Sequence, residues 1–565
     1  MLRIREAGDS ALLAELQAVV DPAVNARAIG IAAAVRAQKI RGVRDVVSTF
    51  ASVAVAFDPL VVDPSTVRAA LREAGELPPP RTTARMIEVP VAYGGEAGPD
   101  LADVAAFAGC TAAEVIERHT SRTYRVYMLG FLPGYPYMAA VEDRIAAPRR
   151  ATPRVRVPAG SVGIAGRQTG IYPRESPGGW QIIGRTSLSL FDPGQTPPAL
   201  MAPGDEVRFV PVPSSVASPS NVASGFSRTE ARPASATEVR LKPDTTYDRA
   251  TRLVTVLHPG LLTTIQDEGR WGYQQLGVPV AGPMDAVAHR LANAVLGNPR
   301  DAATLEATFV GPELRFEDEG WIAVTGADLR PTVDGREAPM GTPVRCRAGS
   351  VLRFADRRSG VRAYIAVDGG VAVPLVLGSR ATHLLSGLGG IDGRALRAGD
   401  RLPLGSRGAS PSGSRGEPGE ARPTTDRARP AGGARLRVLP GPQIDQFDAS
   451  AIEMLRQHRY TVSPQSDRMG YRLSGGVRLQ APAGEMISDA VVMGGVQVPP
   501  SGEPILLMAD RQTTGGYPQL AVVITGDLPL AAQLGPGDWV EFEMCSLADA
   551  AAALREQEGQ LRALR

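Results

Sequence analysis

The sequence predicts a β-rich α+β protein of several domains, in which a small α+β unit precedes barrels or sandwiches. A chain of 565 residues is too long for a single hydrophobic core. Its 62 glycines and 48 prolines interrupt short apolar runs, which favours strands and tight turns over long helices. Clear helical patterns lie mainly near the N-terminus, so we expect helices and strands to be unevenly distributed along the chain.

The composition excludes several classes of function. The apolar share is 43% and the formal net charge is +2, which is globular and implies neither a nucleic-acid nor a membrane partner. Lys39 and Lys242 are the only lysines, and neither lies in a glycine-rich segment. A P-loop, a Ser-Ser-Lys amidase and a biotin carrier each need a lysine, so none of these is encoded here.

The cysteines and the N-terminus indicate a cytoplasmic protein. Cys110, Cys346 and Cys545 are far apart and odd in number, which argues against a disulfide framework and fits a reducing compartment. The first residues carry charges without an apolar segment behind them, and no apolar span approaches 18 residues.

Residues 1–84 are predicted to form the α+β unit. The dipeptides Asp21-Pro22 and Asp63-Pro64 each open a helical pattern, and these patterns close at Gly42 and Gly75. The stretch VRDVVSTFASVAVAF between them alternates as strands do.

Residues 85–213 are predicted to form a barrel or sandwich with one short helix, Thr111 to His119, opened by a capping box of Thr111 and Glu114. Residues 214–251 and 405–433 lack any hydrophobic period, so we expect a flexible linker and a disordered insertion.

The C-terminal half is predicted to contain two barrels, residues 252–404 and 434–550, followed by a helix or tail at 551–565, with Asp285 to Leu296 as its clearest helix. Short internal matches suggest that the two halves contain related barrels. RQTGIYP at 167–173 returns as RQTTGGYP at 511–518, and VTGADLR at Val324 returns as ITGDLPL at Ile524.

The stretch YMLGFLPGYPYM at 127–138 predicts a rigid, non-helical loop after a strand, because its glycines and prolines fix the backbone. Phe131, Tyr135 and Tyr137 could form a wall against a planar ligand, with Gln168, Thr169 and Tyr172 across from it. The alternative is that these aromatic rings only fill the mouth of a barrel.

A second segment, VPAGSVGIAGRQTGIYPRESPGGWQIIGRT from Val157, combines glycines with hydroxyl groups and two cations, Arg167 and Arg174. In a chain nearly without lysine, arginine is the residue left to bind a phosphate or carboxylate, so an anion site is plausible here. Glycine-rich turns with solvated arginines are the alternative.

In the second half, Asp285, His289 and Asn293 are spaced by four residues and share one helix face. The preceding Gly282-Pro283-Met284 brings the Asp285 carboxylate together with helix N-terminal N–H groups, which suits a ligand or Mg²⁺ held near phosphate. A solvated polar face is the alternative.

Two further motifs, QSDRMGYRLSGG and DRQTTGGYPQL, each place an Asp directly before an Arg, at 467–468 and 510–511. Such pairs are often only structural ion pairs. The five histidines have neither zinc-ligand spacing nor a Ser/His/Asp arrangement.

Taken together, HTSRTYRVYMLGFLPGYPYM and PRVRVPAGSVGIAGRQTGIYPRESPGGWQIIGRT resemble the B subunit of 5-oxoprolinase, the KipI family. From Thr255 the chain resembles the C subunit of the same enzyme, the KipA family, through QDEGRWGYQQLGVPVAGPMD, RAYIAVDGGVAVPLVLGSRATHLLSGLGG, SDRMGYRLSG and DRQTTGGYPQLAVV. The resemblance covers nearly all of the chain outside 214–251 and 405–433 and implies a natural fusion. It also implies cyclophilin-like β-barrels and a ferredoxin-like N-terminal α+β unit.

The resemblance implies ATP-dependent opening of 5-oxo-L-proline to L-glutamate, with a separate A subunit of the LamB/YcsF-like family completing the hydrolysis. ATP with Mg²⁺ would be required, and biotin would take part only if a partner supplied it. The first alternative is the carboxyltransferase component of a biotin-dependent urea or amide carboxylase. The second is a regulator that binds a sensor histidine kinase.

The motifs and the resemblance yield a set of expected site residues without an assigned metal-ligand set. The expected catalytic residues are His119, Asp285, Asp467 and Arg468. The residues expected to bind substrate or nucleotide are Phe131, Pro133, Gly134, Tyr135, Gly160, Ser161, Arg167, Gln168, Thr169, Tyr172, Gly178, Gly179, Trp180, Asp267, Arg270, Gly282, Pro283, Met284, His289, Asn293, Arg511, Gln512, Thr513, Gly515, Gly516 and Tyr517.

Overall fold

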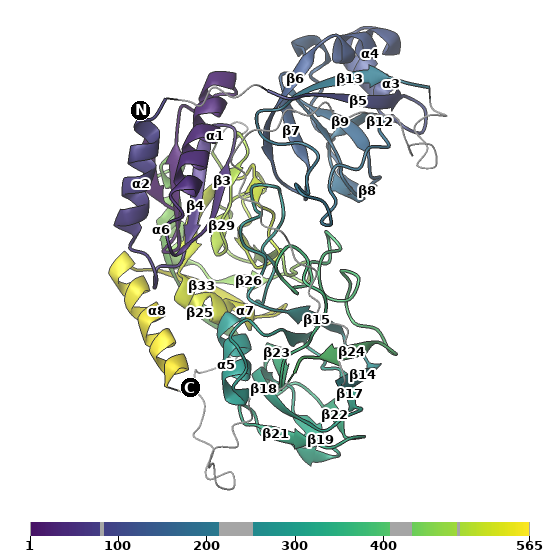
Figure 1. Cartoon of the computed structure of the whole chain (residues 1–565). Helices are drawn as coiled ribbons and strands as arrows, with labels where there is room; N and C mark the ends of the chain where they lie inside the picture. The colour runs from purple at the N-terminus through teal and green to yellow at the C-terminus, as the bar shows by residue number, and fades with distance from the viewer. Residues whose placement is uncertain (1, 79–83, 214–251, 407–431, 483–485, 564–565) are drawn as a thin grey trace. The chain divides into compact units, whose positions relative to one another are not determined.

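A computed structural model describes residues 2–78, 84–213, 252–406, 432–482 and 486–563 (Figure 1). The chain divides into two compact units. Unit 1 comprises Met1–Val19, Arg27–Pro79 and Arg249–Arg565, and unit 2 comprises Val20–Ala26 and Pro80–Asp248. The N-terminal α+β residues therefore pack with the C-terminal half of the chain. Within the described residues, no helix is both long enough and apolar enough to cross a membrane.

The N-terminal α+β region of unit 1 has a four-stranded antiparallel sheet in the order β1-β2-β4-β3. Its elements are β1 (Arg3–Glu6), β2 (Ala11–Glu15), α1 (Pro22–Ala37), β3 (Val43–Ser48), β4 (Ser52–Phe57) and α2 (Pro64–Glu76). Helix α2 begins at Pro64 because the Asp63 side chain accepts from the Ser65 N–H. The predicted α+β unit is present, and its element order is ββαββα. This is a circular permutation of the βαββαβ order, because the strand that comes last in βαββαβ comes first here.

Unit 2 is built around a closed seven-stranded barrel, called barrel 1 here. Going round it, the strands are β5 (Met86–Tyr93), β12 (Gln181–Arg185), β9 (Ser161–Ala165), β10 (Gln168–Ile171), β7 (Pro136–Ala139), β6 (Thr123–Leu129) and β13 (Glu206–Pro211). Strands β8 (Arg154–Val157) and β11 (Ser176–Gly178) pair separately. Helices α3 (Leu101–Ala108) and α4 (Ala112–Thr120) precede β6, and α4 has the predicted capping box.

Residues 252–404 of unit 1 form two sheets, where the sequence suggested a barrel. One sheet has the order β20-β19-β22-β17-β14-β24 and the other β15-β16-β23-β18-β21, with a shared apolar core. Alternating strands fit a barrel or a sandwich equally well, and only the pairing partners of the edge strands separate the two. The strands are β14 (Arg252–His258), β15 (Leu262–Gln266), β16 (Thr304–Thr308), β17 (Glu313–Phe316), β18 (Gly320–Asp328), β19 (Pro331–Val333), β20 (Arg336–Glu337), β21 (Val344–Cys346), β22 (Val351–Phe354), β23 (Ser359–Val367) and β24 (Arg401–Leu404).

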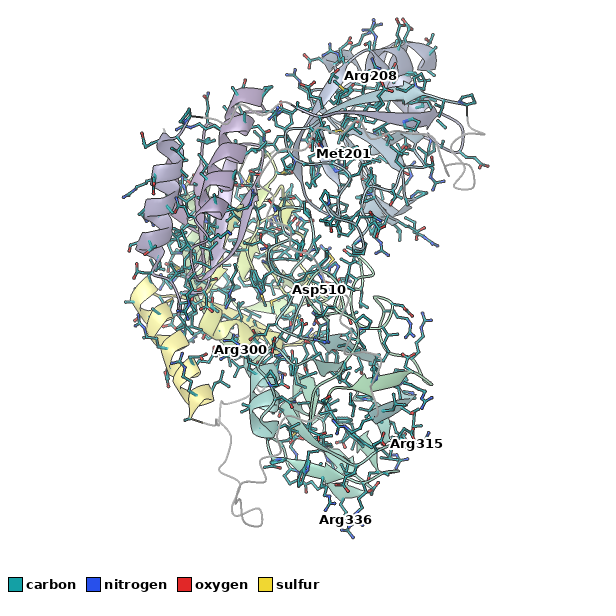
Figure 2. The ribbon with its side chains drawn as sticks, viewed as in Figure 1. Met201, Arg208, Arg300, Arg315, Arg336 and Asp510 are labelled. Carbon is teal, nitrogen blue, oxygen red and sulfur yellow. The ribbon has the colours of Figure 1, made fainter. Side chains whose placement is uncertain are left out.

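Helix α5 (Ala286–Leu296) packs against β18 and β23 of this two-sheet domain. Asp285 caps its first turn, as the sequence predicted. Arg315 and Arg336, labelled in Figure 2, are exposed on the strands of the six-stranded sheet.

The C-terminal part of unit 1 contains the second closed barrel, called barrel 2 here. Its strands in order are β25 (Gly433–Pro440), β32 (Gln519–Val523), β29 (Gly495–Gln497), β30 (Ile505–Leu507), β27 (Gly470–Ser474), β26 (Tyr460–Val462) and β33 (Trp539–Met544). The remaining elements are α6 (Ala451–Gln457), β28 (Asp489–Ala490), β31 (Thr514–Gly515), α7 (Leu528–Ala532) and α8 (Leu547–Arg562). The predicted C-terminal helix thus begins at Leu547 and not at residue 551.

The two barrels have the same strand order, so the prediction of related barrels is confirmed. In each, the first strand runs parallel to the last, β5 with β13 and β25 with β33. In each, two short strands pair outside the ring, β8 with β11 in one barrel and β28 with β31 in the other. The later strand of each pair comes directly before the second strand of the ring.

The two short matches that suggested this relation do not mark equivalent positions. The first RQT lies at strand β10, whereas the second follows β30 and leads into β31. The topological counterpart of TGGYPQ at 514–519 is PGGWQ at 177–181. VTGADLR lies in strand β18, whereas ITGDLPL forms a short 3-10 segment and helix α7.

The N-terminal sheet packs on barrel 2 within unit 1. Asp9 accepts hydrogen bonds from the Thr525 backbone N–H and hydroxyl group, at 3.1 and 2.7 Å. Arg5 pairs with Asp445, and the Ser52 hydroxyl group donates to Asp489. An apolar contact of Leu13 and Ala54 with Ala490 lies between these polar groups.

Candidate functional site

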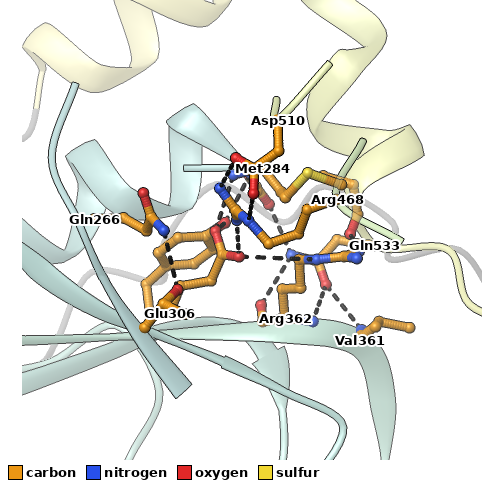
Figure 3. Close-up of polar contacts among 12 residues, drawn as sticks. Gln266, Met284, Glu306, Val361, Arg362, Arg468, Asp510 and Gln533 are labelled. Carbon is orange, nitrogen blue, oxygen red and sulfur yellow. Dashed lines mark hydrogen bonds and ion pairs between the residues drawn. The ribbon is translucent and has the colours of Figure 1, made fainter. Parts of the chain in front are cut away.

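A buried charge network joins barrel 2 to the two-sheet domain (Figure 3). Arg468, in the loop before β27, forms two parallel hydrogen bonds of 2.9 Å to the Asp510 carboxylate. Its third nitrogen bonds Glu306 on β16. All three side chains are at least 94% buried. Because burial alone would disfavour a charged guanidinium, the two carboxylates raise the pKa of Arg468 and keep it charged.

The Gly282–Asp285 turn wraps around this network. The Gly282 carbonyl accepts from Arg468 at 2.7 Å, and the Met284 N–H donates to Glu306 at 2.9 Å. Tyr364 on β23 donates its hydroxyl hydrogen to Glu306 at 2.6 Å, and burial beside that carboxylate raises its pKa well above the usual value. The turn that the sequence selected therefore supports the charge network, and its peptide groups are used inside the protein.

Asp285 is buried, and both of its carboxylate oxygens accept hydrogen bonds from protein groups. One oxygen accepts from the Ala288 N–H at 2.9 Å and the other from the Gln533 amide at 2.8 Å. The Gln533 amide oxygen in turn accepts from the N–H groups of Val361 and Arg362. An Asp285→Asn substitution would keep the cap but would set one amide NH₂ against another, so we expect a loss of stability as well as any loss of activity.

The polar face of helix α5 points inward. His289 and Asn293 are completely buried, with His289 Nδ1 2.9 Å from the Thr304 hydroxyl group. The Asn293 amide donates to the Ala302 carbonyl and its oxygen accepts from Asn298. Burial lowers the pKa of His289 to about 4, so it is neutral. The solvated-face alternative is wrong.

The two Asp-Arg motifs of the sequence do not form ion pairs within themselves, and a single ion pair joins one motif to the other. Arg468 pairs with Asp510, and not with Asp467, which is exposed and accepts from the N–H groups of Met469 and Gly470. Arg511 is thereby left without an ion pair in the described part of the chain. Asp510, labelled in Figure 2, thus belongs to the second motif but forms its ion pair with Arg468 of the first.

A second buried arginine, Arg270, follows strand β15. Its Nε donates to the Val376 carbonyl at 2.7 Å and one terminal nitrogen to the Ala381 carbonyl at 2.8 Å. Asp267 does not bind Arg270 directly; its carboxylate accepts from the Ser379 hydroxyl group and the Arg380 N–H. Burial lowers the pKa of Arg270 to about 10.

Two loops meet beside Asp510, residues 381–386 and 510–514. The His383 Nδ1 accepts from the Ser386 N–H at 3.1 Å, so its proton is on Nε2, which lies 3.5 Å from the Asp510 carbonyl oxygen. Burial lowers the pKa of His383, so this imidazole is a neutral donor. No local sequence pattern marks this histidine, because its partner is 127 residues away.

Buried polar atoms without a hydrogen-bond partner concentrate around these loops. Such atoms are usually paired with protein, with ordered water or with a ligand. Within the described residues of this region they are Gln266 Oε1, Arg270 Nη1, Thr382 Oγ1, Ser386 Oγ, Arg511 Nε, Thr513 Oγ1 and Thr514 Oγ1. The region around Arg511 is therefore the best candidate for a polar ligand site in unit 1.

Of the other predicted residues in this loop, Gln512 is half-buried and Tyr517 is 40% exposed. A Cβ added to Gly515 would lie 3.0 Å from the amides of Gln497 and Gln512, whereas one at Gly516 would lie no closer than 3.6 Å to another residue. Gly515 thus allows two amide side chains to approach the backbone of β31.

In barrel 1, the predicted catalytic His119 is completely buried. Thr169 donates to the Gly163 carbonyl, so it accepts from His119 Nε2 at 3.1 Å, and Tyr93 donates to Nδ1 at 2.8 Å. The ring stacks on Phe209 with centroids 4.5 Å apart. Burial lowers the pKa of His119 to about 3, so it remains neutral, and both nitrogens are used within the barrel.

The predicted aromatic wall is a compact cluster. Tyr135 contacts Phe131, Tyr137, Tyr172 and Trp180, with ring centroids 4.9 to 5.7 Å apart. Tyr135 and Tyr137 are buried, whereas Phe131 is half-exposed. The proposed ligand-facing role of the loop thus rests on Phe131 and stays a prediction.

The glycine-rich segment of barrel 1 shapes this cluster. A Cβ on Gly178 would lie 2.4 Å from the Tyr172 hydroxyl group, and one on Gly160 would lie 2.0 Å from the Thr186 carbonyl oxygen. Gly134 has a positive φ and a Cβ there would approach the Leu190 carbonyl, while Gly179 faces Pro153 more loosely. These glycines have packing functions in the structure.

The polar residues of the same segment are divided between surface and interior. Arg167 is exposed and pairs with the exposed Asp143, and Arg174 is half-buried. Ser161 is buried, and Gln168 Oε1 and Ser176 Oγ are buried without a partner among the described residues. The predicted anion site is therefore not supported by Arg167, but hydrogen-bonding capacity remains beside the aromatic cluster.

Sequence reasoning missed Glu306, Arg362, Tyr364 and Gln533. Arg362 donates to the Tyr471 hydroxyl group and the Ala532 carbonyl, at 2.8 and 2.5 Å. These residues lie inside ordinary strand or helix-end patterns. Only the charges of Glu306 and Arg362 in apolar strands could have drawn attention to them, and Tyr364 and Gln533 carry no such signal.

The carboxylates do not fit a resident Mg²⁺. Glu306 and Asp510 are bound by Arg468, and Asp285 by backbone and amide donors. No group of three or more metal-ligating side chains occurs in the described ranges. Any Mg²⁺ would thus be held mainly by the phosphates of a nucleotide.

Comparison with known proteins gives two family matches. Residues 2–201 match the model described as carboxyltransferase domain, subdomain C and D, and residues 276–544 match carboxyltransferase domain, subdomain A and B. Together they cover barrel 2 and all of barrel 1 except its last strand, β13.

The relatives divide the chain in the same way. It is 38% identical to the C subunit of 5-oxoprolinase from Escherichia coli over 306 residues, which is 54% of this chain and 96% of that protein. It is 41% identical to the B subunit of 5-oxoprolinase from Bacillus subtilis over 222 residues, 37% of this chain and 92% of that protein. A crystal structure of TTHA0988 has a TM-score of 0.79 and 35% identity, and the match covers 96% of this chain and all of that one.

Proposed function

Because the chain belongs to the family of the B and C subunits of 5-oxoprolinase and carries both in one polypeptide, we propose that it is the fused B–C component of an ATP-dependent 5-oxoprolinase. The observation that carries this proposal is the near-complete coverage of both subunits, 96% of the C subunit from one relative and 92% of the B subunit from another. The substrate would be 5-oxo-L-proline, the product L-glutamate, and the missing component a separate A subunit.

The chemistry explains why ATP is needed. A lactam carbonyl is a poor electrophile, so its oxygen attacks the γ-phosphorus of ATP and ADP leaves. Water then adds to the activated ring carbon, and the carbon–nitrogen bond breaks as the nitrogen takes a proton, giving an acyl phosphate. A second water hydrolyses this to L-glutamate and phosphate. The first step needs positioning and charge neutralisation more than covalent chemistry by the protein.

The region around Arg511 in unit 1 is suited to that step. Arg270 and Arg511 are buried cations, and hydroxyl groups of Thr513, Thr514 and Ser386 lie in the two adjoining loops. His383 adds a neutral donor. Arginines can neutralise phosphate or carboxylate oxygens without a lysine.

The proposal is tested by measuring ADP formation. We expect 5-oxoproline-dependent ADP release when the chain is combined with the A subunit, and little with either component alone. The control replaces 5-oxoproline with L-proline, which lacks the lactam carbonyl. Absence of 5-oxoproline-dependent ADP in the combined sample would contradict the proposal.

The second candidate is the carboxyltransferase component of a biotin-dependent carboxylase that acts on urea or a similar amide. The observation that favours it is the description of both family models as carboxyltransferase subdomains. The chain has no lysine in a biotin-carrier context, so a partner would supply the biotin. ADP formation that requires bicarbonate, a biotin carboxylase and a biotinylated carrier would favour this candidate over the first.

A further inference from the structure

Arg511 is a buried cation that has no ion pair with any described residue. Its side chain is 7% exposed, and its one hydrogen bond to a described residue is a long one of 3.3 Å, from Nη2 to Gln274 Oε1. Its Nε is buried without a partner. By contrast, Arg468, whose partner Asp510 directly precedes Arg511 in the chain, has a partner for each of its nitrogens. Burying a charge without an ion pair is costly, and the Asp45 carboxylate, which forms no ion pair with Arg511, offsets only part of that cost. Arg511 can therefore bind a further anion.

Arg511 is held from behind by residues of another segment. Gln274 Oε1 accepts from Arg511, while Gln274 Nε2 lies 3.3 Å from Asp45 Oδ2. Asp45 Oδ2 also accepts from the N–H groups of Gly272 and Gln274, at 2.9 and 3.2 Å. The Asp45 carboxylate is therefore occupied by the 272–274 loop and contacts Arg511 only through the Gln274 amide. This arrangement orients the guanidinium and leaves its Nε free.

Thr513, two residues further on, adds a buried hydroxyl group that also lacks a hydrogen-bond partner among the described residues. Thr513 is 2% exposed. An N–H of arginine and a hydroxyl group are donors that match the two oxygens of a carboxylate. The carboxylate of the preceding residue, Asp510, is already bound by Arg468.

We propose that Arg511, assisted by Thr513, binds the carboxylate of the lactam substrate, and that Asp45 and Gln274 are positioning residues for Arg511. This inference rests on the proposed 5-oxoprolinase function. It assigns a specificity determinant: 5-oxoproline carries a carboxylate, whereas 2-pyrrolidinone, the same ring without it, and urea do not. A site that is built to pair with a charged group rejects an analogue lacking that group, because its own polar atoms are then left unpaired.

Asp45 belongs to the segment that matches carboxyltransferase subdomains C and D, and Arg511 to the segment that matches subdomains A and B. The substrate site would then depend on both segments, although the binding groups themselves come from barrel 2. In relatives with two separate chains, the corresponding contact would form only in the complex.

The test uses the full chain together with the A subunit, and ADP formation is measured against the concentrations of 5-oxoproline and of ATP. We expect Arg511→Gln to raise the KM for 5-oxoproline by roughly 10- to 100-fold and to leave the KM for ATP unchanged. The preference of the enzyme for 5-oxoproline over 2-pyrrolidinone should fall by a similar factor. Gln274→Met should raise the same KM by a smaller factor, because the arginine remains but is no longer oriented.

Arg435→Gln is the matched control, because it removes an arginine of the same barrel that is exposed and pairs with Glu541. It should change neither KM. If Arg511→Gln does not fold, as judged by its thermal melting curve, Arg511→Lys provides the test, since it keeps the charge but loses the Nε donor.

The outcomes separate this inference from the proposed function. Activity of the unaltered chain with 5-oxoproline tests the function, and the variants test the inference. A rise in the KM for ATP alone would assign Arg511 to phosphate and overturn the carboxylate role. An unchanged KM for 5-oxoproline in a folded variant, or a loss confined to kcat, would overturn it as well.

Discussion

Barrels 1 and 2 share one strand order but fill the same position in opposite ways. Just before β7 and just after β10, barrel 1 carries Tyr135 and Tyr172, whose rings lie 5.2 Å apart. At the matching position, before β27 and after β30, barrel 2 carries Arg468 and Asp510 as a buried ion pair. One barrel closes this end with aromatic rings and the other with charge. The fold therefore does not determine the chemistry, which lies in the loops it supports.

The difference has a cause in what surrounds each barrel. The Arg468 side of barrel 2 faces the two-sheet domain, which supplies Glu306 and the Gly282 carbonyl as further partners. The rings around Tyr135 pack against one another, and only their polar hydroxyl groups need hydrogen-bond partners. Buried charge needs partners from several segments, whereas aromatic rings need only area and shape.

The largest effect is expected from breaking the ion pair of barrel 2. Arg468→Met leaves two buried carboxylates without their partner and should reduce the stability of this region by about 3–5 kcal/mol. Because the chain has two units, hydrogen exchange of peptides from β27 and β30 measures this better than one overall unfolding curve.

The same comparison offers a compensating variant. Replacing Arg468 by Met together with Asp510→Leu and Glu306→Gln removes the charges on both sides and should recover most of the loss. Barrel 1 peptides should exchange as in the unaltered chain throughout. If the single variant leaves the exchange of β27 and β30 unchanged, the network does not stabilise this contact.

Barrel 1 should respond to pH through His119. Burial lowers the pKa of this imidazole to about 3 from an ordinary value near 6.5, so the unfolded chain takes up a proton first as the pH falls. The stability of barrel 1 is then fully present above pH 6.5 and should be lost below it, by roughly 2–3 kcal/mol between pH 6.5 and 4.5.

This loss is measured by urea denaturation at pH 7 and at pH 4.5, with the unfolding of barrel 1 followed by hydrogen exchange of its peptides. His119→Gln, whose amide can replace one of the two hydrogen bonds, should be less stable at pH 7 but should lose less on acidification. An equal loss in both proteins would show that His119 is not the titrating group.

How much of this contrast could be predicted from the sequence depends on the distance between partners. Local signals were sufficient for α2, α4 and α5, because Asp63, the Thr111–Glu114 box and Asp285 cap within three residues. The relation of the two barrels also emerged, although from matches that lie at non-equivalent positions. Long-range pairing was out of reach: Glu306 lies 162 residues from Arg468, and nothing in its strand marks it.

The same limit explains the candidate site. Arg511 and Thr513 were selected from a glycine-rich motif, but the sequence suggested that Arg511 pairs with its neighbour Asp510. Only the fold shows that Arg468 takes this carboxylate and that Arg511 Nε has no partner among the described residues. A residue whose significance is the lack of a partner cannot be recognised before its surroundings are known.

A smaller effect distinguishes the matching glycines of the two barrels. Gly178→Ala places a methyl group 2.4 Å from the Tyr172 hydroxyl group within a packed ring cluster, so it should cost about 1–3 kcal/mol in barrel 1. Gly515→Ala, at the equivalent position, meets the amides of Gln497 and Gln512 at 3.0 Å and Val491 at 3.1 Å, which are all longer contacts than the one at Gly178. We expect a cost below that of Gly178→Ala, measured as the shift in urea midpoint for each unit. Equal costs would contradict the view that barrel 1 is closed by rigid rings.

The smallest effect is expected from shortening the chain before barrel 2. The sequence predicts a disordered insertion at residues 405–433; most of that segment lies outside the described residues, but its two ends do not. The Gly405 carbonyl accepts from Arg252 at 3.1 Å, and Gly433 is the first residue of β25.

Replacing only residues 407–431 by a short Gly-Ser linker should therefore leave the melting temperature and the ADP-forming activity within error of the unaltered chain, because the replaced sequence has no apolar period. A deletion that also removes Gly405 and Ser406 should be less stable, since it takes away one acceptor of Arg252, which then keeps only its bonds to Asp368. Equal melting temperatures for the two deletions would show that this contact contributes little, and a large loss in the shorter deletion would show that residues 407–431 take part in the fold.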